Sequence, residues 1–214
     1  MRMLILIKRE IVDHIGYFIA AAILSALFIV LCISLVIRNE AGSIDWPELE
    51  FGLAAPIVAL VLICITAMGA SQMHNDKNSR ISAFLSTLPT SRSAILTARV
   101  IAGLIAILLV VLPVSIGGYI LVGIIAPPVP IFTQMLTEIA ITAFLMCVAC
   151  YCMGLLTGWT SSRILPTLGA LVLVSLIIPL IIIKGFGLQI EIILLLFIIA
   201  SLSRTWCKFS STSL

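Results

Sequence analysis

The sequence carries few charged side chains. Only 10% of its 214 residues are Asp, Glu, Lys or Arg, whereas 62% are hydrophobic. A soluble domain usually contains about 25% charged residues. This deficit excludes an ordinary soluble domain, and the long apolar runs place the chain among membrane proteins.

Motifs for nucleotide binding and hydrolysis are also lacking. The sequence contains no phosphate-binding loop ending in Gly-Lys-Ser or Gly-Lys-Thr, no HExxH, no GxSxG and no glycine-rich dinucleotide fingerprint. We therefore predict that the chain is not an enzyme and binds no cofactor. Any energised work would draw on a partner protein or an ion gradient.

The predicted external loops lack cysteine, which argues against a disulfide framework. Three cysteines cluster in one apolar run: Cys147, Cys150 and Cys152. Thiolates bind soft metals, but no histidine or further cysteine is placed to complete a site. We expect the cluster to serve as small apolar packing residues, and no metal to be bound.

Acidic residues are nearly absent from the apolar runs. Glu138 and Glu191 are the two exceptions, and each lies near a predicted external end. A proton or cation relay would use such carboxylates. Both glutamates lack a predicted buried basic partner, so we expect interfacial positions for them.

Long apolar runs occupy most of the chain. Spanning a bilayer takes roughly 20 apolar residues. Runs of this length cover 15–37, 51–73, 100–126, 132–158, 164–183 and 188–206. We predict an all-α integral membrane protein whose six transmembrane helices form a single domain, 1–214.

Lys and Arg are distributed unequally between the two sides of this predicted topology. Apart from Arg38 and Lys184, they fall at the two termini, between the second and third runs, and between the fourth and fifth. Cytoplasmic loops are enriched in Lys and Arg. We therefore place both termini in the cytoplasm. This bias also explains the net charge of +3 without a nucleic-acid partner.

Residues 1–14 predict a short amphipathic helix ahead of the first span. Three apolar residues recur at helical spacing: Leu4, Ile7 and Ile11. The charged residues Arg2, Arg9 and Asp13 cluster on the opposite side. Such a helix is suited to the cytoplasmic interface of the membrane. His14, and likewise His74, is expected there as a polar anchor.

The segment between the second and third runs, 74–98, predicts a cytoplasmic loop with its own helix. Four apolar residues share one helix face: Ile81, Phe84, Leu85 and Leu88. Pro89 ends this helix. Thr90 or Ser91 can then cap a second helix, which carries Arg92 and Arg99 into the third span. An exposed apolar face of this kind can lie on lipid or dock into a partner protein.

Gly154 and Gly158 form a GxxxG pair at the end of the fourth run. Small residues at this spacing permit close approach of two membrane helices. We therefore expect a helix neighbour at this position.

The 74–98 loop resembles the first cytoplasmic loop of ABC transporter type 2 permeases. The resemblance rests on Asp76, the segment LSTLPTSR from Leu85 to Arg92, Ile95 and the pair Ala98–Arg99. The family has an acidic residue, then a leucine, leucine-proline, small residue and arginine, then an isoleucine and an alanine-basic pair. A fainter resemblance links the region from Leu155 to Lys184 to the haem-exporter B-type subunit of cytochrome c maturation.

The chain departs from the family pattern in three respects. Asp76 stands where glutamate is usual, and Asn78 and Ser79 replace the usual glycine and threonine. Longer external helices between the fifth and sixth spans are common in relatives, and this sequence has no room for them. The subfamily is therefore left open.

The resemblance implies a permease subunit of an ATP-driven exporter in the cytoplasmic (inner) membrane of a prokaryote. The helix 81–88 would dock on a cytoplasmic ABC ATPase, present in two copies and carrying ATP-Mg. A second permease subunit, identical or paralogous, would complete the membrane part among membrane lipids. The cargo would be hydrophobic or amphipathic. The implied docking residues are Arg80, Ile81, Phe84, Leu85, Leu88, Pro89 and Arg92, with Asp76 as a candidate motif acid.

Two other functions fit the same sequence. A non-transporting assembly or anchor module would bind a different soluble partner through the same loop. An ion-coupled secondary transporter would require Glu138 or Glu191 and inverted repeats. No convincing repeat relates the two halves of the sequence, which disfavours the transporter.

Overall fold

The computed structural model describes residues 2–40, 47–79, 92–125, 130–158 and 187–211, with single positions at 168, 172 and 175. These ranges contain helices and no strand, so the all-helical prediction is confirmed for them. The helices are α1 (Arg2–Asp13), α2 (Ile15–Glu40), α3 (Pro47–Ser79), α5 (Arg92–Ile125), α6 (Pro130–Thr157) and α8 (Leu188–Ser211).

Four of these helices, α3, α5, α6 and α8, are long and apolar enough to cross a membrane. A fifth span is obtained when α1 and α2 are counted together as one bent pair. Large apolar side chains such as Ile23 of α2 and Leu196 of α8 are exposed on the outside of the bundle. Long apolar helices with apolar outer faces indicate a multi-pass membrane protein. Of the predicted fifth span, 164–183, only positions 168, 172 and 175 are described, so the span itself is not tested.

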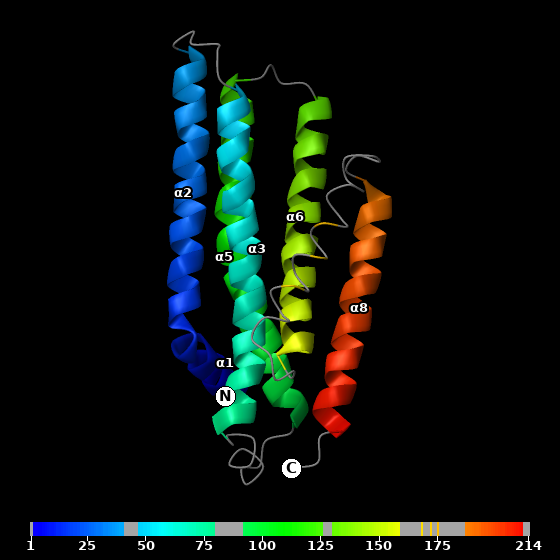
Figure 1. Ribbon diagram of the computed structural model, residues 1–214. Coiled ribbons are helices and arrows are strands. Elements are labelled where there is room, and N and C mark those ends of the chain that lie inside the picture. The colour runs from blue at the N-terminus through cyan, green and yellow to red at the C-terminus, as the bar shows by residue number, and fades with distance from the viewer. Residues whose placement is uncertain are drawn as a thin grey trace.

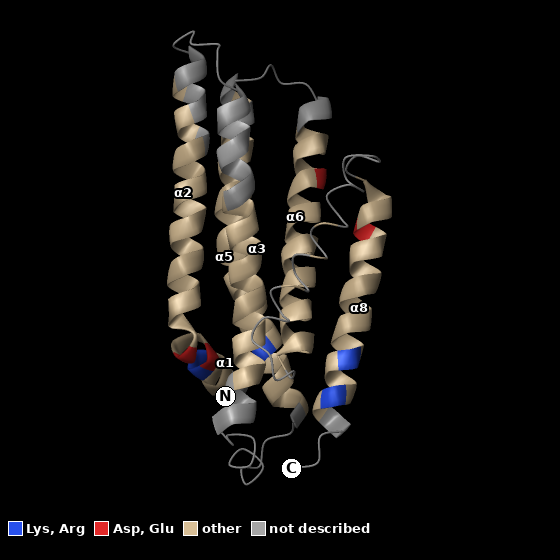
Figure 2. Cartoon of the chain, in the orientation of Figure 1, with Lys and Arg blue, Asp and Glu red and all other residues tan. Residues whose placement is uncertain are grey.

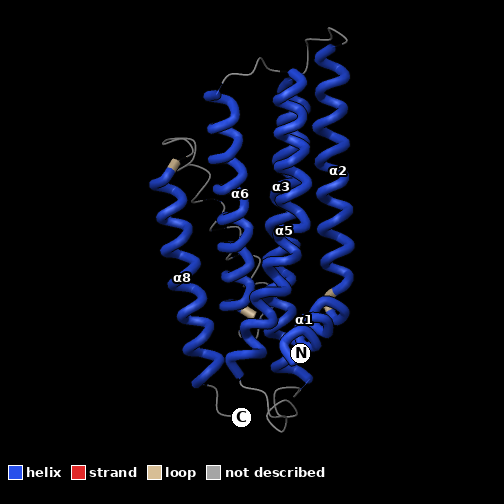
Figure 3. Tube along the Cα trace, turned by 180° about the vertical axis from the view of Figure 1, so that it is seen from behind, coloured by secondary structure: helices blue, strands red, loops and turns tan. Residues whose placement is uncertain are grey.

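Four helices form a ring in which each contacts its two neighbours. α2 contacts α3 and α5, and α6 contacts α3 and α5 on the other side. α8 packs outside the ring against α6, and α1 packs against α5 (Figures 1 and 3). α1 lies at the end of the bundle where α5 begins and where α3, α6 and α8 end (Figure 1). We call this the α1 end.

The chain bends by 71° between α1 and α2. The bend falls where the sequence changes from a charged amphipathic segment to an uncharged apolar one, and His14 stands between the two helices. The His14 amide donates to the Glu10 carbonyl at 3.2 Å, and the Tyr17 amide donates to the His14 carbonyl at 2.9 Å. The predicted N-terminal helix therefore exists, and it turns away from the axis of α2.

The apolar face predicted for α1 is divided between protein and surroundings. Ile7 and Ile11 are half-buried, while Leu4 and Ile5 are exposed. Because α1 contacts α5, part of this face packs against the bundle. Of the predicted face, only Leu4 is exposed, and Ile5 beside it is exposed as well; the placement of the helix at the membrane interface stays a prediction.

A seam of glycines joins α3 and α6, and we call it the glycine seam. A Cβ added at Gly154 would lie 2.2 Å from the Thr66 carbonyl oxygen, and one at Gly158 would lie 2.6 Å from the Ala70 carbonyl oxygen. On α3, a Cβ at Gly69 would lie 2.7 Å from the Tyr151 carbonyl oxygen. Only glycine permits such backbone approach. The close contact predicted for the GxxxG pair is therefore confirmed, with α3 as the neighbour.

Candidate functional site

The predicted docking helix falls between α3 and α5. α3 continues through Ser79, and α5 begins at Arg92. The expected loop, 74–98, is thus helical at both of its ends. The predicted docking residues from Arg80 to Pro89 lie outside the described residues. Asp76 and Arg92 lie on helices, but their side chains are outside the described part of the structure as well.

Directly inside the α1 end, α1, α3, α5 and α6 contribute a largely buried group of side chains that are linked by hydrogen bonds. Its members are Glu10, Gln72, Met73, Arg99 and Tyr151, and we call it the polar cluster. It lies beside the helix ends that flank the predicted docking loop. The candidate site consists of the predicted docking loop and this cluster beside it, and of the two the structure describes the cluster.

Arg99 is the centre of the polar cluster. Its side chain is only 2% exposed, although it lies about two turns after the start of α5 at Arg92. Its Nε donates to Glu10 Oε1 at 3.3 Å, and its Nη1 donates to Met73 Sδ at 3.6 Å. The guanidinium therefore ties α5 both to α1 and to α3.

The Glu10–Arg99 pair explains how a charge is accommodated at this depth. A buried guanidinium is costly unless it is paired and hydrogen-bonded. The Glu10 side chain is 16% exposed, so its carboxylate retains some contact with the surroundings. Attraction between the two charges is only weakly screened where one partner is fully buried. The pair thus favours the position of α1 against α5 that keeps the two groups together.

Tyr151 connects the ion pair to α6. Its hydroxyl donates to Gln72 Oε1 at 2.6 Å and lies 2.9 Å from the backbone carbonyl oxygen of Arg99. The tyrosine ring rests on Gly103, where an added Cβ would lie 2.2 Å from the ring carbon Cζ. Gly103 therefore permits Tyr151 to reach α5 and α3 at once.

His14 is buried at the bend between α1 and α2, and was expected instead as an interfacial anchor. Its Nδ1 lies 3.1 Å from the Glu10 carbonyl oxygen and 3.8 Å from Glu10 Oε2. The backbone bend at this residue turns the imidazole inward, where it packs beside the carboxylate. His14 therefore contacts both the backbone carbonyl and the carboxylate of Glu10.

The two glutamates of the apolar runs lie apart from this cluster. The acidic positions of α6 and α8 lie toward the end away from α1, whereas the basic positions of α8 lie near the α1 end (Figure 2). Glu138 accepts a hydrogen bond from Gln134 Nε2, one turn earlier on α6, at 3.2 Å. Both glutamates are half-buried.

The cysteine cluster contributes to helix packing. Cys147, Cys150 and Cys152 are buried free thiols. Cys150 lies beside Thr66 of α3, and Cys152 lies beside Ser201 of α8. Across the described ranges, no group of three His, Cys, Asp or Glu residues could hold a metal ion.

Sequence reasoning missed the polar cluster. The sequence placed Arg99 on the cytoplasmic side, at the start of the third span and in the family motif, but gave it no partner, and Glu10 was not singled out. One signal was present: Arg99 is followed by an uncharged apolar run, so its side chain enters the span. The cluster has no nucleophile beside a base, and what its geometry can do is couple the positions of four helices. Comparison of the chain with protein-family models, with curated proteins and with solved structures gave no match.

Proposed function

We propose that this chain is the membrane subunit of an ATP-driven ABC exporter of the type 2 permease class. In this proposal the segment 80–91 docks on a separate cytoplasmic ATPase, and the membrane helices provide the path for a hydrophobic or amphipathic cargo. The resemblance of the segment from Asp76 to Arg99 to the family loop suggests the class. The membrane would be the cytoplasmic membrane of a prokaryote.

The proposal requires six spans with both termini in the cytoplasm. α6 and α8 run in the same direction along the bundle (Figure 1), which is compatible with one further crossing between them. The described Lys and Arg residues gather toward the α1 end (Figure 2). Basic residues are enriched on the cytoplasmic side, so we assign the α1 end to the cytoplasm.

The observation that carries the proposal is the attachment of the loop to the polar cluster. α5 begins at Arg92, immediately after the segment 80–91 of the loop. About two turns later, Arg99 is paired with Glu10 of α1, and its carbonyl accepts the Tyr151 hydroxyl of α6. A force applied to the loop would therefore reach α1 and α6 through defined contacts, as transmission from an ATPase requires.

In the proposed mechanism the chain supplies movement but no chemistry. Two ATPase subunits, each holding ATP-Mg, would bind beneath two permease subunits, identical or paralogous. Closure of the ATPases would displace the 80–91 segments. The displacement would rotate or tilt α5 together with its partners in the polar cluster, repacking the membrane helices around the cargo.

Reconstitution with the candidate ATPase tests the proposal. The ATPase encoded nearest to this chain would be co-expressed, purified with it in lipid nanodiscs, and assayed for ATP hydrolysis. Phe84→Asp should abolish association and the stimulation of hydrolysis, because a charge cannot enter an apolar docking groove without a large desolvation cost. Phe84→Leu is the matched control and should retain both.

Three results would count against the proposal. Full coupling in Phe84→Asp would show that the predicted apolar face of the helix 81–88 is not the docking surface. Failure of any ABC ATPase to associate, with another soluble protein bound through the loop, would favour an anchor module. Transport that needs an ion gradient and Glu138 or Glu191, but no ATP, would favour a secondary transporter.

A further inference from the structure

A cavity of about 300 Å³ lies inside the ring formed by α2, α3, α5 and α6. It extends from the middle of the bundle toward the end away from α1, and all four helices line it. Phe28, Leu62, Val114, Gly118, Leu136 and Ala140 are among the lining residues. It is separate from the polar cluster, none of whose members lines it.

The lining selects an apolar occupant. None of the described lining residues is charged, and the hydroxyl-bearing ones are Ser25 and Ser115. Ser25 Oγ already donates to the Ala22 carbonyl at 2.9 Å. A buried water needs two to four polar partners, and apolar cavities of this size stay dry and bind apolar molecules. Water is therefore a poor occupant of this space.

The cavity is elongated along the helices. Its lining on α6 runs from Leu136 to Cys147, a rise of about 16 Å along the helix. An extended hydrocarbon chain follows such a space along its whole length, whereas a compact molecule fills only part of it. The long axis follows the helices, which is also the direction of the acyl chains in a bilayer.

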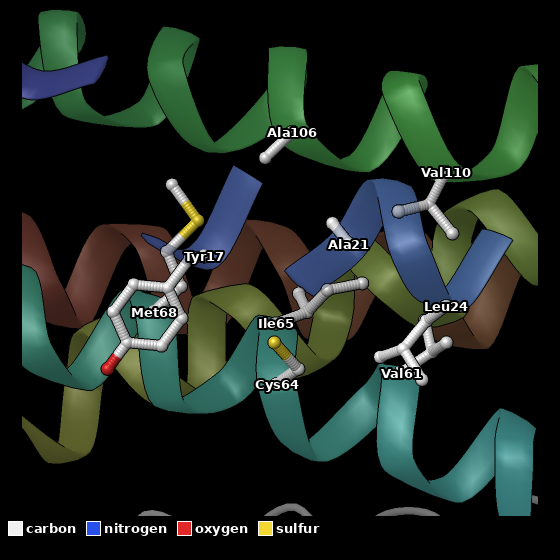
Figure 4. A pocket seen from close by; sticks show the side chains of 9 residues that line it. All are labelled: Tyr17, Ala21, Leu24, Val61, Cys64, Ile65, Met68, Ala106 and Val110. Atoms are coloured by element: carbon white, nitrogen blue, oxygen red, sulfur yellow. The ribbon is translucent and has the colours of Figure 1, made fainter. Parts of the chain in front are cut away.

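The cavity closes toward the α1 end. There the space between α2, α3 and α5 narrows to about 10 Å³, roughly one water-sized probe (Figure 4). Leu24, Val61 and Val110 line both spaces. Met68 and Ala106 lie beyond them, on the α1 side (Figure 4). An occupant is therefore stopped about halfway along the bundle.

We infer that this cavity binds a hydrocarbon chain, supplied either by a membrane phospholipid or by a free fatty acid. The lining determines the apolar chemistry, the extent along the helices favours a chain, and the narrowing toward the α1 end limits how far the chain enters. The inference goes beyond the proposed function, because the site lies within one chain and needs no ATPase.

Photo-crosslinking of the full-length chain in phosphatidylcholine nanodiscs tests the inference. One arm uses a phospholipid, and the other a free fatty acid, each with a diazirine near the end of its chain. Cross-linked peptides are mapped by mass spectrometry. The wild type should be labelled at cavity residues such as Leu62, Val114 and Ala140 in one arm or both, and the more efficient arm identifies the source of the chain.

Gly118→Leu should reduce cavity labelling about tenfold, because its side chain would occupy the space needed by the ligand. An added Cβ at Gly118 meets only Leu136 Cδ2, at 4.0 Å, so the helices can accept it. Gly123→Leu is the matched control on the same helix: Gly123 is exposed, and an added Cβ there meets nothing within 4 Å. It should leave cavity labelling unchanged.

Ala140→Phe fills the same cavity from α6 and provides a second variant if Gly118→Leu does not fold. The inference is overturned if label in the wild type is confined to outward residues such as Ile23 and Leu196. It is also overturned if a folded cavity-filling variant retains wild-type labelling of the cavity. If the wild type is labelled in the cavity but couples to no ATPase, the result would contradict the proposed function alone.

Discussion

Glu10 and Arg99 stand 89 positions apart in the sequence, yet Arg99 Nε lies 3.3 Å from Glu10 Oε1. The contact joins the first helix to the helix that follows the predicted docking loop. It places the one fully buried guanidinium of the described residues where it can respond to movement of that loop.

Arg99→Met should lower the free energy of unfolding by about 3 kcal/mol, because it leaves the Glu10 carboxylate largely buried without its partner. The double variant Glu10→Met/Arg99→Met should cost less than the sum of the two single changes. Arg9→Met is the control, since the Arg9–Asp13 pair is half-exposed and should contribute only a few tenths of a kcal/mol. Steric-trapping measurements in bicelles would report these values, and additive single changes would show that the pair is uncoupled.

Tyr151→Phe should destabilise the protein by roughly 1–3 kcal/mol, because the one hydroxyl that serves Gln72 Oε1 and the neighbouring Arg99 carbonyl would be lost from a buried site. Tyr119→Phe provides the comparison: Tyr119 is an exposed residue of α5, and its hydroxyl bonds to Thr137. Thermal unfolding of the two variants side by side distinguishes them. Equal shifts would mean that burial of the Tyr151 hydroxyl contributes nothing.

Gly154→Ala should destabilise the contact between α3 and α6 by about 2 kcal/mol or more, since its Cβ would lie 2.2 Å from the Thr66 carbonyl oxygen. Gly123→Ala should be neutral or slightly stabilising, because the added methyl meets nothing and alanine favours the helix. The unfolding midpoint in denaturant measures both effects. A neutral Gly154→Ala would show that the helices can separate at little cost.

Cysteine labelling should locate the α1 end on the cytoplasmic side. Cys207, exposed near the end of α8, should react with a membrane-impermeant maleimide only after right-side-out vesicles are permeabilised. Thr133→Cys, exposed near the start of α6, should react in intact vesicles. Cys207→Ser is the control: it should abolish the maleimide labelling of the wild type if Cys207 is the residue that reacts. The reverse pattern would invert the proposed topology.

Hydropathy was sufficient to locate the helices but insufficient to pair them. The runs 15–37, 51–73, 100–126, 132–158 and 188–206 each fall on a described helix to within several residues, except that α3 and α5 extend further at the α1 end. A run of apolar residues determines that a segment enters the bilayer, because the transfer free energy sums along the chain. It says little about which face meets which neighbour.

The polar cluster could not be predicted from hydropathy and charge distribution. An arginine near the cytoplasmic end of a span satisfies the positive-inside rule equally well if it is exposed or buried. Its burial depends on Glu10 arriving from another helix and on Gly103 making room for Tyr151. The glycine seam was easier to foresee, because spacing within α6 alone indicates a close contact, although it does not name Gly69 of α3 as the facing residue.

The glycine seam limits which movements the bundle can make. Backbone atoms of α3 and α6 touch without intervening side chains, so neither helix can slide or rotate past the other without a clash. We therefore expect these two helices to move together. A seam of this kind gives the described part of the bundle a stiff centre, around which the outer helices α1, α2 and α8 are attached.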